Sequence, residues 1–118
     1  MKSGWEEHKG KKIFFARYDH MTMQEVRAEV GEVKKNMALN PSNNTLLVLV
    51  DTTGTIVSPE VLNLYKEVAA ASGSIKSRTA ILGMSGPRRS ILEIVSAFSK
   101  NKVIPFDDAQ KAKDWLVA

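Results

Sequence analysis

Residues 44–66 read NTLLVLVDTTGTIVSPEVLNLYK, and this stretch decides the fold. It contains an unbroken branched aliphatic run, Leu46–Val50. A strand with one face in water alternates apolar and polar residues, whereas such a run between polar residues is typical of a strand buried on both faces of a parallel sheet. A polar loop follows from Asp51, and a helix is predicted at Ser58-Pro59, because serine favours the N-cap and proline fits the first helical position.

Three further strand–helix units are predicted around this one. The strands are expected at 13–18, 79–84 and 102–106, and the helices are expected to begin at Thr22, Ser85 and Asp107. Pro105 places the last strand at an edge of the sheet, where a missing amide is harmless. Residues 1–10 contain one large apolar side chain, Trp5, and either fray or form an edge strand. The alternation predicts an α/β fold with four βα units in a mainly parallel sheet, as one domain over residues 1–118.

Residue spacing also predicts helix caps and inner faces. Thr22 and Glu25 have the spacing of a capping box. Asp107 is expected to cap the last helix. The inner face of the third helix is expected to consist of four apolar residues, Ile91, Ile94, Val95 and Phe98.

Composition excludes several classes of function. The chain has 118 residues, 43% of them hydrophobic. A chain of this length can bury a core without metal or disulfide support. It contains no cysteine, which excludes disulfides, thiolate metal sites and cysteine nucleophiles. No apolar run approaches the roughly 20 residues that span a bilayer, and the amino-terminal residues lack the apolar segment of a signal peptide. We therefore expect a cytoplasmic protein with no membrane span.

The net charge of +4 does not point to nucleic acid. The excess lies partly in Lys9, Lys11 and Lys12 and partly in Arg88 and Arg89, so it is scattered along the chain. No aromatic residues are interleaved with a basic stripe, as they are in proteins that bind single-stranded nucleic acid. We expect no nucleic-acid partner.

Loops that leave the carboxyl ends of parallel strands gather at one edge of the sheet. The first such loop whose side chains could take part in chemistry consists of Asp51, Thr52, Thr53, Gly54 and Thr55. A hydroxyl beside the strand-end aspartate could accept a phosphate. Alternatively, the aspartate and threonines bond to local amides while Gly54 supplies a turn.

The second loop opens the third helix and consists of Ser85, Gly86, Pro87, Arg88, Arg89 and Ser90. A helix amino terminus presents free amides, and two arginines add charge that could hold a phosphate or carboxylate. The alternative is an ordinary N-cap followed by solvated arginines. The loop lacks the GxxxxGK[ST] motif, so it is not a nucleotide P-loop.

Catalytic and metal-binding patterns are missing from the sequence. His8 and His20 are the only histidines, and neither has the spacing of a metal ligand. The segment from Gly83 to Gly86 lacks the second glycine of a G-x-S-x-G elbow at the required distance. We therefore predict that the protein is not an enzyme, and we assign no catalytic residue, metal site or cofactor.

With these segments assembled, the chain resembles the STAS-like domains, the fold of bacterial anti-sigma-factor antagonists, and in particular a small bacterial subgroup of SpoIIAA-like proteins. The likeness covers nearly the whole chain and rests on His8–Lys11, LLVLVDTTGT, TAILG from Thr79, PFDD from Pro105 and AKDWL from Ala112. It implies a βα superhelix with helices mainly on one side of the sheet. Lipid-binding CRAL-TRIO domains are similar in that architecture.

The resemblance also implies a function. In phosphorylated antagonists a serine follows the aspartate that ends the central strand, and Thr52 stands at the matching position. The leading hypothesis is a non-enzymatic regulatory module that contacts a protein partner through Asp51–Thr55. The alternative is a module that binds a small anionic or lipid-like ligand near Arg88 and Arg89. The sequence does not decide between a monomer and a homodimer.

Overall fold

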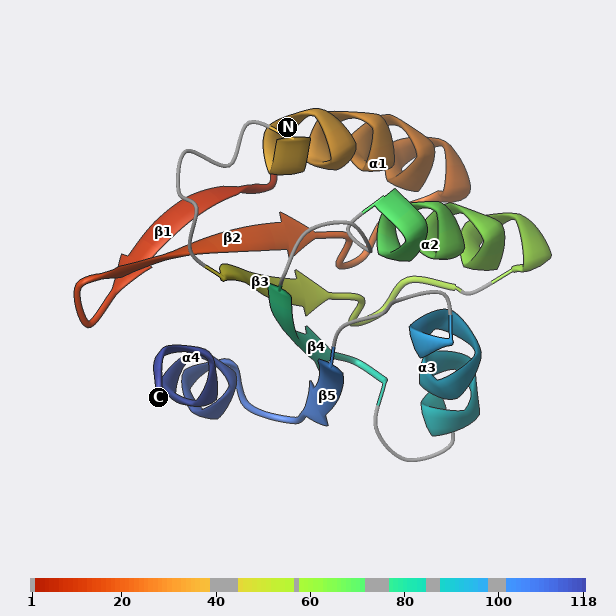
Figure 1. The fold of residues 1–118 in the computed structure, drawn as a ribbon. Coiled ribbons are helices and arrows are strands. Elements are labelled where there is room, and N and C mark those ends of the chain that lie inside the picture. The colour runs from red at the N-terminus through yellow and green to blue at the C-terminus, as the bar shows by residue number, and fades with distance from the viewer. Residues whose placement is uncertain (1, 39–44, 57, 72–76, 85–87, 98–101) are drawn as a thin grey trace.

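A computed structural model describes residues 2–38, 45–56, 58–71, 77–84, 88–97 and 102–118. They form β1 (Gly4–His8), β2 (Lys11–Arg17), α1 (Met23–Ala38), β3 (Leu46–Asp51), α2 (Pro59–Ala71), β4 (Ser77–Leu82), α3 (Arg89–Ser96), β5 (Lys102–Phe106) and α4 (Ala109–Val117). The strands lie in one sheet in the order β1-β2-β3-β4-β5 (Figure 1). The predicted α/β class is confirmed.

The sheet is parallel from β2 to β5, and these strands with their helices are the four predicted βα units. β1 pairs antiparallel with β2, so the amino-terminal residues form an edge strand. The hairpin between them turns at Lys9 and Gly10, whose φ angles of 49° and 81° are the positive values that tight hairpin turns require. Pro105 pairs with Ile81 in β5, which is the opposite edge strand, as its proline predicted.

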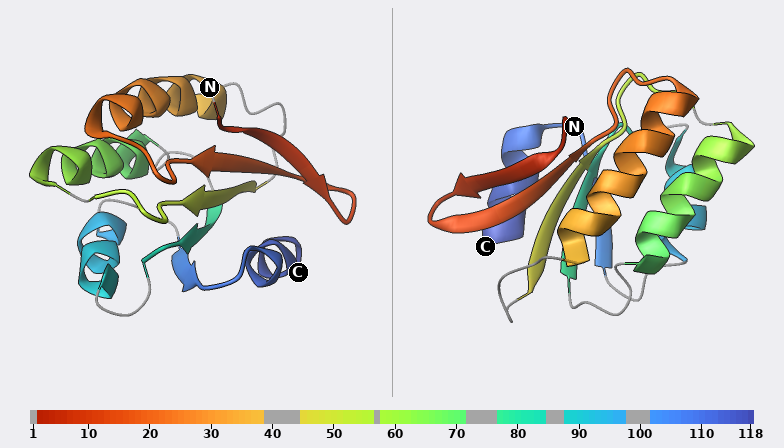
Figure 2. Two further views of the ribbon diagram at one scale, coloured as in Figure 1. Left: turned by 180° about the vertical axis from the view of Figure 1, so that it is seen from behind. Right: turned by 90° about the horizontal axis from the view of Figure 1, so that it is seen from above.

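Helices α1, α2 and α3 cover one face of the sheet, and α4 covers the other (Figure 2). The larger apolar cluster joins α1, α2 and α3 to the sheet, with Val30, Val61 and Leu92 among its members. The smaller cluster contains Ala112 and Leu116 of α4. Helices mainly on one side are what the resemblance implied.

The central strand β3 contributes to both clusters, which explains its unbroken apolar run. Leu46 and Val48 belong to the larger cluster, while Leu47 and Leu49 belong to the smaller one. Successive side chains of a strand point to opposite faces, so a strand covered on both sides needs an apolar residue at every position.

Two of the three predicted helix caps are confirmed. In α1 the Glu25 amide donates to Thr22 Oγ1 (3.2 Å), and the Thr22 amide donates to Glu25 Oε1 (3.1 Å). In α2 the Val61 amide donates to Ser58 Oγ (3.2 Å). The prediction for α4 was wrong by one residue: Asp108 is the N-cap, and its carboxylate accepts from the amides of Gln110 and Lys111.

The predicted inner face of α3 was also partly wrong. Leu92 is buried at 5% exposure, whereas Ile94 is 46% exposed. The helix contains apolar residues at neighbouring positions and has only 8 residues, so spacing alone leaves its rotation ambiguous. The side chains of Val95 and Phe98, and residues 85–87 where the helix was expected to begin, lie outside the described part of the chain.

Candidate functional site

The loops that follow β2 and β3 are joined by backbone hydrogen bonds. The Tyr18 amide donates to the Asp51 carbonyl, and the His20 amide donates to the Thr53 carbonyl, both at 2.9 Å. These bonds extend the pairing of the two parallel strands beyond their ends. The candidate loop Asp51–Thr55 therefore has a defined backbone, set by its neighbour.

The side chain of Thr55 also links the two loops by hydrogen bonds. It is only 3% exposed. Its hydroxyl donates to the Tyr18 carbonyl and accepts from the Met21 amide. A threonine that both donates and accepts in a buried position is a structural part of the loop.

Thr52, the predicted phosphoacceptor, lies inside the protein. Its exposure is 0%. Its hydroxyl donates to the Leu82 carbonyl at 2.7 Å, and its amide donates to the same carbonyl at 2.9 Å. The backbone of Gly83 packs closely against Thr52: a Cβ added at residue 83 would be only 2.8 Å from Thr52 Oγ1. The hydroxyl is enclosed in this conformation.

Arg88 brings the two candidate sites together. Its guanidinium donates to the Thr52 carbonyl (3.4 Å) and to the Thr55 carbonyl (3.1 Å). This cation therefore braces the loop after β3 from the start of α3. Arg89 and Ser90, the other described members of the predicted anion site, are exposed. Ser85 and Gly86 lie outside the described residues.

The outer surface of the loop is exposed and includes one large apolar side chain. Thr53 and Gly54 are exposed, and the Asp51 carboxylate accepts from the Thr53 amide at 3.0 Å. Ile56 is 85% exposed. It borders an open groove of about 560 Å³, whose lining includes Met21. An isolated exposed isoleucine is common, but one beside a groove and a braced loop is a candidate contact point.

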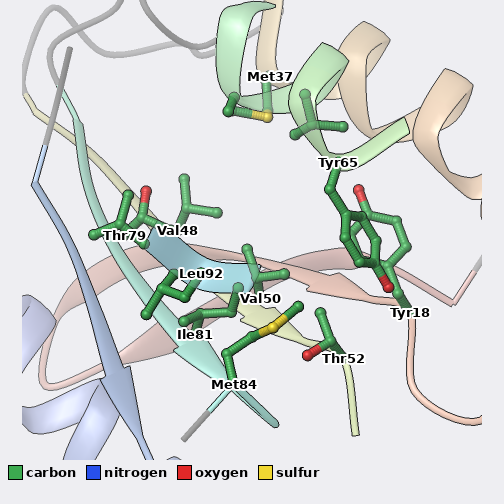
Figure 3. Close-up of a pocket in the computed structure, with 13 residues that line it drawn as sticks. Tyr18, Met37, Val48, Val50, Thr52, Tyr65, Thr79, Ile81, Met84 and Leu92 are labelled. Atoms are coloured by element: carbon green, nitrogen blue, oxygen red, sulfur yellow. The ribbon is translucent and has the colours of Figure 1, made fainter. Parts of the chain in front are cut away.

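A cavity of about 60 Å³ lies on the α2 and α3 side of the sheet. Its lining includes Tyr18, Val50, Tyr65, Ile81 and Leu92 (Figure 3). No single stretch of the sequence indicates this cavity, because its residues come from separate elements. No charged residue is among the described residues that line it.

Two tyrosines form one end of this cavity, with their ring centroids 5.5 Å apart (Figure 3). Tyr18 is 1% exposed and Tyr65 is 5% exposed. Within the described chain, neither hydroxyl has a hydrogen-bond partner, a state that costs roughly 1–3 kcal/mol for a buried polar group. Burial raises the pKa of Tyr18, and it raises the pKa of Tyr65 to about 12. Both hydroxyls are therefore protonated donors at neutral pH.

The two histidines have structural contacts. His8 Nε2 lies 2.8 Å from Asp114 Oδ1, and Lys9 Nζ lies 3.0 Å from the same oxygen, which ties the β1–β2 hairpin to α4. These two hydrogen bonds hold the pKa of Asp114 below its usual value. His20 packs against Gly54. In the portion of the chain that the structure describes, no group of three or more His, Asp or Glu side chains is placed to hold a metal ion.

Comparison with known proteins identifies the architecture. No family model matches the sequence, and no curated protein sequence matches it. The structure is similar to the crystal structure of an uncharacterized protein of the DUF3478 family with a SpoIIAA-like fold, from Shewanella loihica PV-4. The TM-score is 0.72 and the sequence identity 16%, over 97% of this chain and 91% of that chain. The chain has the SpoIIAA-like fold.

Within this SpoIIAA-like fold the candidate loop follows the middle strand of the sheet, β3. An identity of 16% supports the shared fold alone, so the role of the loop depends on its own geometry. Among the described helices, none is long and apolar enough to cross a membrane.

Proposed function

We propose that this protein is a non-enzymatic regulatory module that binds a protein partner through the edge bearing Asp51–Thr55. The observation that carries this proposal is the 85% exposure of Ile56 beside the braced loop and the groove. Large side chains that a partner can bury completely supply most of the binding energy at protein interfaces. Ile56 is therefore the proposed anchor.

The hydrogen bonds of the loop support the same proposal. Thr52 and Thr55 are buried, and Arg88 donates to both of their carbonyls. The loop backbone is thus ordered before any partner arrives, which lowers the entropic cost of association. The exposed Thr53 and Gly54 remain available for contact.

A pull-down from an extract of the native cells tests the proposal. The bait is the wild-type protein or Ile56→Ser, and the matched control is Ile94→Ser, which changes the same residue type on α3. We expect the wild type and the control to retain a common partner that Ile56→Ser loses. Equal retention by all three baits would refute this site.

Phosphorylation of Thr52 would require the loop Asp51–Thr55 to open first, so that the buried hydroxyl becomes exposed. The hydroxyl is fully buried, and a phosphate carries a charge of about −1.5 to −2 at neutral pH, which cannot be buried unpaired. A phosphate on Thr52 would therefore displace the loop from the Leu82 carbonyl. We propose that such a modification, if the cell makes it, abolishes partner binding, which the pull-down measures with Thr52→Glu.

The alternative, an anionic or lipid-like ligand near Arg88 and Arg89, ranks second. Arg88 already donates to loop carbonyls, which leaves Arg89 as the exposed cation at this helix start. A rise in melting temperature with sulfate that Arg89→Ala abolishes would favour this alternative. An unchanged melting temperature would eliminate it.

Self-association through β1 is a further proposal. β1 is an edge strand and Trp5 on it is 37% exposed, so a second copy could pair along it. Glu6 and Glu7 lie in the middle of the same strand, and charges there disfavour edge pairing. Light scattering at two concentrations distinguishes a monomer from a dimer.

A further inference from the structure

We propose that the partner enters the groove beside Ile56 with an extended segment in which an apolar residue stands next to a lysine or arginine. This inference rests on the proposed function, since it specifies the chemistry that the same edge recognises. It is carried by the side chains that line the groove, by the free backbone of the loop, and by carboxylates at the starts of α1 and α2.

The accessible surface of the groove favours an apolar side chain. Ile56 is 85% exposed and Met23 is half-buried, while the other two apolar residues of the lining, Met21 and Val61, are buried. The groove measures about 560 Å³, within the roughly 300–1,000 Å³ of pockets that enclose a ligand. Methionine adapts its shape to different apolar groups and is common at binding surfaces. An apolar side chain in this space would cover the exposed parts of Ile56 and Met23.

The backbone of the loop is free to pair with an extended segment. Gly54 and Ile56 line the groove, and among the described residues no group bonds to their amides or carbonyls. By contrast, the carbonyls of Thr53 and Thr55, on either side of Gly54, already accept hydrogen bonds. An extended segment presents its own amides and carbonyls to such a rim, whereas a helix uses them internally. We therefore expect the partner segment to be extended.

Carboxylates at two helix starts set the charge of the partner. Helices α1 and α2 lie side by side and begin at the same end (Figure 2). Glu60 lines the groove in the first turn of α2, and Glu25 stands in the first turn of α1, where Thr22 lines it. Arg27 pairs with Glu60 at 3.4 Å, but these side chains are 61% and 64% exposed, so the pair is weak. Since two carboxylates share this one cation, a lysine or arginine of the partner is attracted and an acidic residue is repelled.

Selection of a phage-displayed library of random peptides on the full chain tests the proposal. We expect the enriched peptides to share an apolar residue next to a lysine or arginine. A synthetic peptide of the enriched sequence should bind the wild type and the matched control Ile94→Ser equally. It should bind Ile56→Ser about tenfold more weakly, because that variant removes the apolar contact. Both isoleucines are exposed, so both variants should keep the melting temperature of the wild type.

Charge reversal tests the basic residue of the segment separately. Replacing the lysine or arginine of the synthetic peptide by glutamate should weaken its binding to the wild type about threefold. Glu60→Lys should remove this preference for the basic peptide, because it places a cation in the lining. Glu32→Lys makes the same change at an exposed position of α1 outside the groove and should keep the preference.

The outcomes separate this inference from the proposed function. The inference is overturned if no peptide is enriched, if the enriched peptides lack a lysine or arginine, or if Glu60→Lys still prefers the basic peptide. Enriched peptides that lack a cation but require Ile56 would overturn the chemistry of the partner and leave the proposed function standing. If Ile56→Ser retains both the peptides and the partner from the cell extract, both proposals fail.

Discussion

The imidazole ring of His20 packs so closely against Gly54 that a Cβ at residue 54 would overlap His20 Nδ1 and Cε1. Both residues have positive φ angles, 52° for His20 and 74° for Gly54. The two loops thus approach each other in conformations that side chains rarely adopt, and the missing side chain of Gly54 makes room for the ring. Residue 54 is glycine for both reasons.

Gly54→Ala should lower the free energy of unfolding by more than the strain of a positive φ alone, which is about 1 kcal/mol. Gly10→Ala is the matched control, since Gly10 has a φ of 81° with nothing within 4 Å of the added Cβ. In the His20→Ala background the cost of Gly54→Ala should fall to that of the control. Urea denaturation measures all of these values. Equal costs for Gly54→Ala and Gly10→Ala would contradict the packing of His20 on Gly54.

Thr52→Val should destabilise the protein by about 1 kcal/mol, because it removes the hydroxyl that donates to the Leu82 carbonyl while preserving the shape of the side chain. Thr53→Val changes the exposed neighbour and should stay within about 0.5 kcal/mol of wild type. Chemical denaturation of both variants provides the comparison. The buried role of Thr52 is wrong if the two substitutions cost the same.

Val48→Asp should cost several kcal/mol, which is comparable with the total stability of a small domain. Val48 is 3% exposed and pairs with Phe14 and Thr79 in the neighbouring strands, so the substitution would bury a carboxylate in an apolar part of the core. Ile94→Asp on the exposed side of α3 is the control and should remain folded. A soluble Val48→Asp protein with an unchanged melting temperature would show that β3 is not interior.

Tyr65 should make stability depend on pH in the alkaline range. Burial raises its pKa from 10.0 to about 12, so the folded state holds the phenol proton where an unfolded tyrosine releases it. This contribution to stability is complete below pH 10 and is lost as the pH rises through about 12. Measured from denaturation curves, the stability of wild type should therefore fall relative to that of Tyr65→Phe as the pH rises over this range. Parallel curves would mean that the pKa of Tyr65 is not raised.

The strands β2 to β5 and most helices could be predicted because their signals are local, whereas the sequence left open whether residues 1–10 form a strand. The run from Leu46 to Val50 requires cover on both faces, and the capping box at Thr22 marks the start of α1. Local spacing failed where two solutions fit equally. Asp107 and Asp108 are of the same residue type, which favours the N-cap position, and only Asp108 caps α4. In the 8-residue α3, apolar spacing fits an inner face with Ile94 as well as the observed one with Leu92.

The organisation of the candidate site could be predicted only in part. Parallel strands place their loops on one edge, so the proximity of Asp51–Thr55 and Arg88 followed from topology. The direction of the Arg88 side chain did not, because its contacts with the Thr52 and Thr55 carbonyls depend on packing between distant segments. The cavity at Tyr65 could not be predicted for the same reason. A space enclosed by several elements leaves no pattern in the sequence of any one of them.

The sequential strand order has a consequence for how the protein is made. Each strand pairs with the one that precedes it in the chain, from β1 to β5, without skipping a neighbour. During synthesis, every new strand therefore emerges from the ribosome after the strand it will pair with. Pairing of segments close in sequence also favours rapid folding. The sheet can grow in the direction of translation, and no early strand has to wait for a partner encoded at the far end of the message.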